Sequence, residues 1–226
     1  MRDLFEKFNI NISDIQQEKF EKYYELLVFY NSKFNITAIT EKNEVIVKHF
    51  IDSALGSEKV GCGKLIDVGS GGGFPAIPLK IMNDDIELTL LEATGKKCEF
   101  LKAVVDNLGL KGVKVINDRA ETLAKNVEFR EKFDICTARA VARLNTLSEY
   151  CMPFVKVGGK FVSYKGDANE EVKEAQAAFK ALGGKLKEVF NYDLDGAKRA
   201  LITVEKISST DKKYPRGNGK ERKNPL

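Results

Sequence analysis

The sequence of 226 residues predicts an α/β fold built on a mostly parallel sheet of seven strands. Two observations predict it. Short apolar segments typical of buried strands alternate with helical segments from residue 64 onward, which implies parallel strands joined by right-handed crossovers. The segments 185–192 and 199–207 then read as a closing antiparallel hairpin.

Residues 1–60 lack strand alternation and predict a helical cap. The run 13–16, Ser-Asp-Ile-Gln, is a capping-box start of a helix. Phe20, Tyr23 and Leu27 then recur at helical spacing on one face. We expect this aromatic stripe to be buried core rather than a surface that stacks on bases.

A loop over 31–40 and a second helix over about 43–55 complete the cap. His49, the only histidine, lies in that second helix between apolar neighbours. A histidine in such surroundings is more often a packed, hydrogen-bonded residue than a catalyst, and we expect the former. The cap is expected to pack against the main domain and to frame the substrate.

The stretch 64–78 passes from a short strand through the glycine-rich run 69–73 into a helix that begins near Pro75. Such a unit brings bare backbone close to a ligand at a helix N-terminus. Phe74 stands where the dinucleotide motif needs glycine, and no Gly-Lys-Ser/Thr follows, so neither that motif nor a phosphate-binding P-loop fits. A nucleoside-type ligand is predicted, with a plain tight turn as the alternative.

Asp67 precedes the first glycine of this loop, Gly69, by two residues, and Gly71 and Gly73 complete the pattern Asp-x-Gly-x-Gly-x-Gly. The pattern resembles motif I of the class I S-adenosylmethionine-dependent methyltransferases. A cationic cofactor without phosphate suits a loop that contains an acid rather than a lysine. We therefore expect Asp67, Gly69 and Gly71 to bind the cofactor.

The next strand, 87–91, ends at Glu92, which lies 23 residues beyond Gly69. An acid at that distance accepts the ribose hydroxyls in nucleoside-binding α/β folds, so Glu92 is the predicted ribose ligand. A helix over 95–108 and a strand over 113–116 follow. The run 118–121 comes after that strand, where the adenine edge is expected, with the backbone of Ala120 and the Glu121 side chain as its contacts.

The fourth strand, 133–138, is expected to point its carboxyl end at the transferable methyl group. It lacks the Asn/Asp-Pro-Pro-Tyr/Phe motif of enzymes that methylate exocyclic amines, and Cys136 lacks the neighbouring proline of pyrimidine-carbon methyltransferases. Arg139 follows the strand, where it would contact the cofactor or an acidic polymer, or else belong to a structural ion pair. A fifth strand over 160–164 and a helix over 169–182 precede the hairpin.

A site without an evident general base is compatible with methylation of guanine N7. That nitrogen carries an in-plane lone pair and needs no proton removed before it attacks a methyl group. Catalysis could then rest on alignment of the two reactants and exclusion of water.

Composition is that of a globular protein, with 43% hydrophobic and 31% charged residues and no apolar run long enough for a membrane span. The N-terminus has no apolar signal core, so we expect a cytoplasmic protein. None of the four cysteines forms a C-x-x-C pair, so neither zinc nor a disulfide framework is indicated, and reduced, mostly buried thiols are expected.

The positive charge of the chain lies at its C-terminus. From residue 206 onward there are seven basic residues and two acids, whereas the rest of the chain contains 30 basic and 31 acidic residues. Charge of this kind gives salt-dependent affinity for phosphates, although solvated basic tails are also common. Lys213 and Arg216 are the candidate RNA contacts in the tail, and Lys165 and Arg199 at strand ends could extend the basic surface.

Together these motifs make the sequence similar to the RsmG (GidB) family of bacterial 16S ribosomal RNA guanine-N7 methyltransferases. The resemblance covers nearly the whole chain and is carried by residues 34–39, 49–53, 67–75, 119–121, 138–140, 164–166 and 213–216. The family commonly has glycine at Ala76, arginine at Gly217 and proline at Glu221. The two tail differences make the tail less positive.

The resemblance implies a Rossmann-like class I methyltransferase that transfers a methyl group from S-adenosyl-L-methionine to N7 of one guanine in the 530 loop of small-subunit rRNA. It implies cofactor contacts at Gly69, Phe74, Ala120, Glu121 and Arg139. It suggests that four basic residues serve the RNA or the reaction centre: Arg119, Arg139, Lys165 and Arg199. Of these, Arg139 and Lys165 are the candidate catalytic residues.

We expect three parts: a helical cap (1–60), a methyltransferase domain (61–207) and a basic tail (208–226). The expected partner is the small ribosomal subunit, with no membrane and no metal, and the protein is expected to be a monomer. Two other functions stay open. A methyltransferase for a small molecule or a protein would bind RNA weakly or without salt dependence, and a non-enzymatic assembly factor would bind RNA but not the cofactor.

Overall fold

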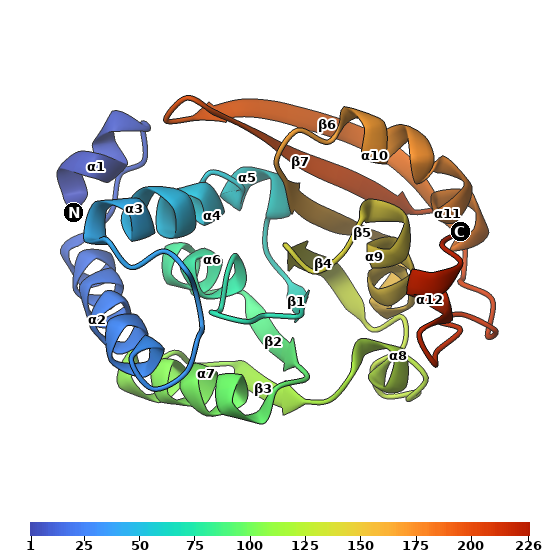
Figure 1. Ribbon diagram of the computed structural model, residues 1–226, viewed down its shortest axis with the longest axis horizontal. Coiled ribbons are helices and arrows are strands. Elements are labelled where there is room, and N and C mark those ends of the chain that lie inside the picture. The colour runs from blue at the N-terminus through green and yellow to red at the C-terminus, as the bar shows by residue number, and fades with distance from the viewer.

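A seven-stranded sheet runs through the computed structural model, which describes residues 1–226, in the order β3-β2-β1-β4-β5-β7-β6 (Figure 1). Strands β1 to β5 pair in parallel, and β7 pairs antiparallel with both β5 and β6. The predicted parallel sheet with a closing hairpin is confirmed. The strands are β1 (Lys64–Val68), β2 (Glu87–Glu92), β3 (Val113–Asn117), β4 (Phe133–Arg139), β5 (Val155–Lys165), β6 (Gly184–Leu194) and β7 (Ala197–Lys206).

Helices cover both faces of the sheet, and each face has its own hydrophobic cluster. One cluster contains residues of α1 (Arg2–Lys7), α2 (Asp14–Asn31), α6 (Ala76–Met82) and α7 (Gly95–Asn107). The other contains residues of α8 (Ala120–Leu123), α9 (Leu144–Cys151), α10 (Asn169–Glu174) and α11 (Gln176–Ala181). Figure 1 shows the blue to green helices on one side and the yellow to red ones on the other. None of these helices has the length and apolarity needed to cross a membrane.

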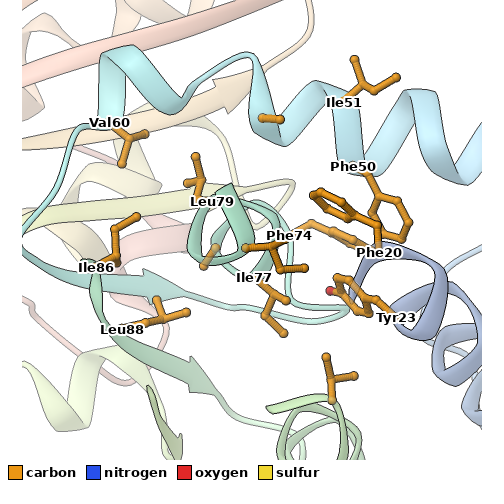
Figure 2. Packing of buried hydrophobic residues seen from close by; sticks show 14 of the residues in the cluster. Phe20, Tyr23, Phe50, Ile51, Val60, Phe74, Ile77, Leu79, Ile86 and Leu88 are labelled. Carbon is orange, nitrogen blue, oxygen red and sulfur yellow. The ribbon is translucent and has the colours of Figure 1, made fainter. Parts of the chain in front are cut away.

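The capping box at the start of α2 forms as predicted. The Gln16 amide donates to Ser13 Oγ at 3.2 Å, and the Ser13 amide donates to Gln16 Oε1 at 2.9 Å. Phe20 and Tyr23 are fully buried, which confirms the aromatic stripe as core. The Tyr23 ring stacks on Phe74 at 5.4 Å, and its hydroxyl donates to the carbonyl of Gly72 (Figure 2). The cap is therefore joined to the glycine-rich loop.

The second helix of the cap departs from a regular α-helix. The predicted single helix is α3 (Lys42–Val45), a π-helical segment η1 (Ile46–Ile51) and α4 (Asp52–Ala54) in one continuous run, with α5 (Ser57–Val60) just beyond it. π-Helical turns are rare and occur frequently at functional sites. Here the wider turns span Ile46–Ile51, include His49 and end immediately before Asp52.

Other elements also differ from the prediction. β5 begins at Val155, five residues early, after the short 3₁₀ turn η2 (Met152–Phe154), and the predicted helix over 169–182 is interrupted at Ala175 to give α10 and α11. The crossover helix α9 was not predicted as an element, although parallel β4 and β5 require a crossover. Cys62 is exposed, whereas the other three cysteines are buried.

The C-terminal tail packs on the domain rather than extending from it. Its short helix α12 (Lys220–Lys223) lies beside α9, and Thr146 Oγ1 donates to the Glu221 carbonyl at 3.0 Å. The Arg216 guanidinium pairs with the fully buried Glu149 carboxylate at 2.7 Å. Some basic residues of the tail, such as Arg216, therefore form ion pairs within the protein and are not free to bind a ligand.

Candidate functional site

The glycine-rich loop lies where β1 ends, and its glycines are required by its geometry. Gly69 has φ +71° and Gly73 has φ +86°, in the left-handed region that side chains disfavour. A Cβ on Gly69 would lie 2.7 Å from Val141 Cγ2, and one on Gly73 would lie 2.5 Å from the Tyr23 hydroxyl. The loop can pass this close to its neighbours only without side chains.

Two buried acids support the loop. Asp67 is 1% exposed, and its Oδ1 accepts from Thr137 Oγ1 at 2.7 Å. Its Oδ2 is buried without a partner, and burial raises the pKa of this carboxyl to about 7. Glu92 Oε2 accepts from the Gly71 amide at 2.9 Å and Oε1 from the Thr94 amide at 2.8 Å. Glu92 therefore holds the loop through its carboxylate, whereas Asp67 contacts the loop through its backbone carbonyl, which accepts from Ser70 Oγ at 3.0 Å.

A hollow of about 250 Å³, which we call the nucleoside hollow, opens beside this loop. Gly69 and Ala93 form one side, and the run 118–121 forms another, so the predicted Arg119, Ala120 and Glu121 line it together. Arg119 is exposed and lies 3.6 Å from Glu121. Gly219 and Arg222 of the tail complete the wall, which the sequence did not indicate.

A second hollow of about 340 Å³, the basic hollow, lies at the carboxyl ends of β4 and β5 against the cap. It brings together three predicted residues, Arg139, Lys165 and Arg199. Four lining residues come from the cap: Ile39, Lys48, His49 and Asp52. Its cations suit an anionic or guanine-containing ligand.

Phe74 connects the glycine-rich loop with this basic hollow. The guanidinium of Arg139 lies 5.0 Å from the centre of the Phe74 ring, and the His49 ring stacks on it at 4.5 Å. Arg139 therefore lies between Phe74 and the basic hollow, and its contact with cofactor or acceptor stays a prediction. The placement is compatible with both the ligand contact and the structural ion pair that the sequence left open.

One buried carboxylate organises the basic side chains. Asp52 is 3% exposed and accepts from Arg139 Nη1 at 2.9 Å and from the Tyr192 hydroxyl at 2.8 Å. Arg199 Nε lies 3.7 Å from the same group. A carboxylate with three such neighbours fixes the positions of two arginines from different strands.

His49 is half-buried and uses both ring nitrogens. Nδ1 lies 3.2 Å from Arg139 Nη2 and 3.1 Å from the Lys48 carbonyl oxygen, and Nε2 lies 2.9 Å from Thr37 Oγ1. Burial and the charge of Arg139 lower the pKa of His49 to about 3, so the ring is neutral. The packed, hydrogen-bonded setting agrees with the prediction, but the sequence did not place His49 and Asp52 in the site. The motif 49–53 was their only signal.

The remaining predicted basic residues have different settings. Lys165 Nζ lies 2.7 Å from Glu171 Oε2 and 2.6 Å from the Ala142 carbonyl, so it is held at the rim of the basic hollow. Lys213 is exposed, with Asp211 at 3.6 Å. The Arg216 guanidinium is occupied by Glu149, so the structure does not bring it to the basic hollow.

The fold is shared with solved methyltransferases. A SAM-dependent methyltransferase from Aquifex aeolicus matches with a TM-score of 0.54 at 15% identity, over 71% of this chain and 92% of that chain. Geranyl diphosphate methyltransferase in complex with SAM matches with a TM-score of 0.54 at 12% identity, over 70% of this chain and 85% of that chain. At such identities the likeness concerns the fold alone.

Sequence comparison identifies closer relatives. The protein named ribosomal RNA small subunit methyltransferase G from Limosilactobacillus reuteri is 46% identical over 96% of this chain and 94% of its own. The protein of the same name from Lachnoclostridium phytofermentans is 45% identical over 96% and 92%. The family model described as rRNA small subunit methyltransferase G matches residues 16–205. The chain therefore belongs to this methyltransferase family, GidB.

Proposed function

We propose that this protein transfers a methyl group from S-adenosyl-L-methionine to N7 of one guanine in the 530 loop of 16S rRNA. The observation that carries the proposal is that the glycine-rich loop, with the Phe74 that follows it, connects two hollows. The nucleoside hollow contains Gly69, and the basic hollow contains Arg139, whose guanidinium lies over Phe74. Family membership adds that small-subunit rRNA is the named substrate of the relatives.

The residues present fit the cofactor. The glycine-rich loop leaves a surface that a Cβ would fill at Gly69, and the buried Asp67 Oδ2 has no protein donor. We expect Gly69, Gly71 and Phe74 to hold the methionine side and Glu92 the ribose, with Ala120 and Glu121 at the adenine edge. S-Adenosylmethionine supplies an electrophilic methyl group when bound.

The acceptor chemistry fits the absence of an available base. His49 stays neutral at physiological pH, and both of its nitrogens are occupied. The Asp52 carboxylate is surrounded by three donors. Guanine N7 requires no proton transfer before attack, so alignment by the basic hollow is sufficient. Arg139 and Lys165 would align the acceptor, and Arg199 would contact guanine O6 or a phosphate.

The cap and the tail have distinct roles in this proposal. Residues 1–60 close the acceptor side through Lys48 and His49, while residues 208–226 close the nucleoside hollow through Gly219 and Arg222. Exposed Arg119 and Lys213 would contact rRNA phosphates. The substrate places the protein in the cytoplasm, where it would act as a monomer.

The test is transfer of a labelled methyl group to small ribosomal subunits from a strain that lacks this protein. The labelled RNA is then cleaved chemically at N7-methylguanine and mapped. We expect one labelled guanine in the 530 loop, and we expect Arg139→Ala to abolish it. Label at another base or atom would contradict the proposal, and label on protein or small molecules alone would favour a different acceptor.

A further inference from the structure

A third hollow, of about 410 Å³, opens next to the basic hollow and shares Arg199 with it. We call it the side hollow. It lies between the residues that follow β5 and the β6–β7 hairpin, and Tyr192 is its one hydrophobic lining residue. Neither the cofactor nor the methylated base, as proposed above, occupies it.

The lining of the side hollow suits an uncharged planar group. Two aspartates oppose Lys198 and Arg199, so the formal charges cancel. Asp193 Oδ1 accepts from the Gly196 amide at 2.8 Å, and the other acid, Asp167, lies 3.9 Å from Lys198 Nζ, so both acids have protein partners.

Two carboxamides, from Asn169 and Asn191, also line the side hollow, together with the half-buried ring of Tyr192, and the Asn169 side-chain amide donates to Asp167 Oδ1 at 3.1 Å. Asn191 is exposed, and its side-chain amide makes no hydrogen bond to the protein. A carboxamide both donates and accepts, as the edge of a nucleobase does, and aromatic rings stack on unpaired RNA bases. The chemistry of the hollow therefore matches a nucleobase better than a phosphate.

Arg199 supplies the charge between the two hollows. Its Nε lies 3.7 Å from Asp52, and its Nη1 donates to the Lys198 carbonyl at 3.1 Å. Its Nη2 makes no hydrogen bond to the protein and remains available. Neighbouring nucleotides of one RNA strand are joined by a phosphate, which is the group that a free guanidinium nitrogen binds well.

We propose that the side hollow binds the base of a nucleotide adjacent to the methylated guanine, with Arg199 on the phosphate that joins them. The proposal rests on the function proposed above, because it takes the basic hollow as the guanine site. It adds a second nucleotide subsite, so that substrate recognition includes a neighbour of the target base.

Photocrosslinking tests the position directly. The full-length variant Asn191→p-benzoylphenylalanine is irradiated on small subunits from the strain lacking this protein, and the crosslink is mapped by arrest of reverse transcription. We expect a crosslink within two nucleotides of the guanine that the wild type methylates. Val127→p-benzoylphenylalanine is the control, since Val127 is 79% exposed and lies outside all three hollows, and it should not crosslink there.

A kinetic variant gives a second readout. Asn191 is exposed, so Asn191→Ala should fold normally; we expect it to raise KM for small subunits about tenfold, with the Kd for S-adenosylmethionine unchanged. If the wild type methylates its target, an unchanged KM for Asn191→Ala or a crosslink far from the methylated guanine would overturn the side-hollow proposal alone. If the wild type labels no small-subunit RNA, the proposed function itself fails.

Discussion

Replacement of Asp52 by asparagine tests whether one buried carboxylate organises the basic hollow. The side chain is 3% exposed, and it accepts from Arg139 Nη1 at 2.9 Å and from the Tyr192 hydroxyl at 2.8 Å on different oxygens. Asparagine has nearly the same shape but only one acceptor oxygen. If that oxygen keeps the Tyr192 bond, the amide NH₂ faces Arg139, donor against donor.

The magnitude follows from these contacts. A hydrogen bond to a charged group contributes roughly 1.5–3 kcal/mol and a neutral one roughly 0.5–1.5 kcal/mol. The substitution also leaves the charges of Arg139 and Arg199 without their shared counter-charge. We expect Asp52→Asn to lower the free energy of unfolding by about 2 kcal/mol, which lowers Tm by about 4–8 °C for a chain of this size.

The same change should disturb catalysis through Arg139, whose guanidinium lies over Phe74. We expect kcat/KM for small subunits to fall at least tenfold, measured alongside thermal unfolding. The control is Asp14→Asn, because Asp14 is 90% exposed and pairs only with Arg2, so its effect on stability should stay below about 0.5 kcal/mol. An Asp52→Asn protein with wild-type Tm and wild-type transfer rate would refute the reasoning.

Three further predictions concern the loop and the tail. Burial raises the pKa of Asp67 to about 7, above its unfolded value, so its contribution to stability is full below about pH 4 and is lost as the pH rises to 7. Urea unfolding of wild type relative to Asp67→Asn should therefore show a loss of about 2 kcal/mol between pH 5 and 7. If the free energy of unfolding changed equally with pH in both proteins, the prediction would be contradicted. Gly69→Ala places a Cβ 2.7 Å from Val141 Cγ2 at φ +71°, so titration calorimetry should show S-adenosylmethionine affinity reduced by a factor of ten or more; unchanged affinity would mean that the loop does not shape the cofactor site. Arg216→Ala leaves the fully buried Glu149 unpaired, which should cost about 3–5 kcal/mol in urea unfolding, and the double variant with Glu149→Gln should recover part of it.

The sheet and the glycine-rich loop were predictable because their signals are local. An apolar strand followed at once by Gly69 and its neighbours specifies a strand, a tight loop and a helix within 15 residues. The position of Glu92 beside the loop was predicted from its distance along the chain, and its contact with the ribose stays a prediction. The hydrogen bonds of Glu92 to the Gly71 and Thr94 amides could not be predicted. Sequence spacing places a residue near a loop but does not show which side of the loop it faces.

Asp52 and His49 were missed because their importance depends on contacts between distant segments. Asp52 is 87 residues from Arg139 and 140 residues from Tyr192 along the chain, so it contacts them only when the cap packs against the sheet. The π-helical turns that include His49 also have no simple periodic signature, since a helix pattern in sequence assumes regular α-helical spacing. Long-range polar contacts of this kind are invisible to patterns of residue spacing.

The tail shows why a charge count overstates an RNA-binding surface. Two of the seven basic residues from position 206 onward are used inside the protein: Lys206, at the end of β7, is fully buried against Thr210 and Glu131, and Arg216 pairs with buried Glu149. Arg222 is exposed but forms part of the nucleoside hollow. At most four tail cations are then free to neutralise rRNA phosphates. The electrostatic attraction that the tail adds is correspondingly smaller than its sequence indicates, and the tail contributes to the cofactor site as well as to the RNA side.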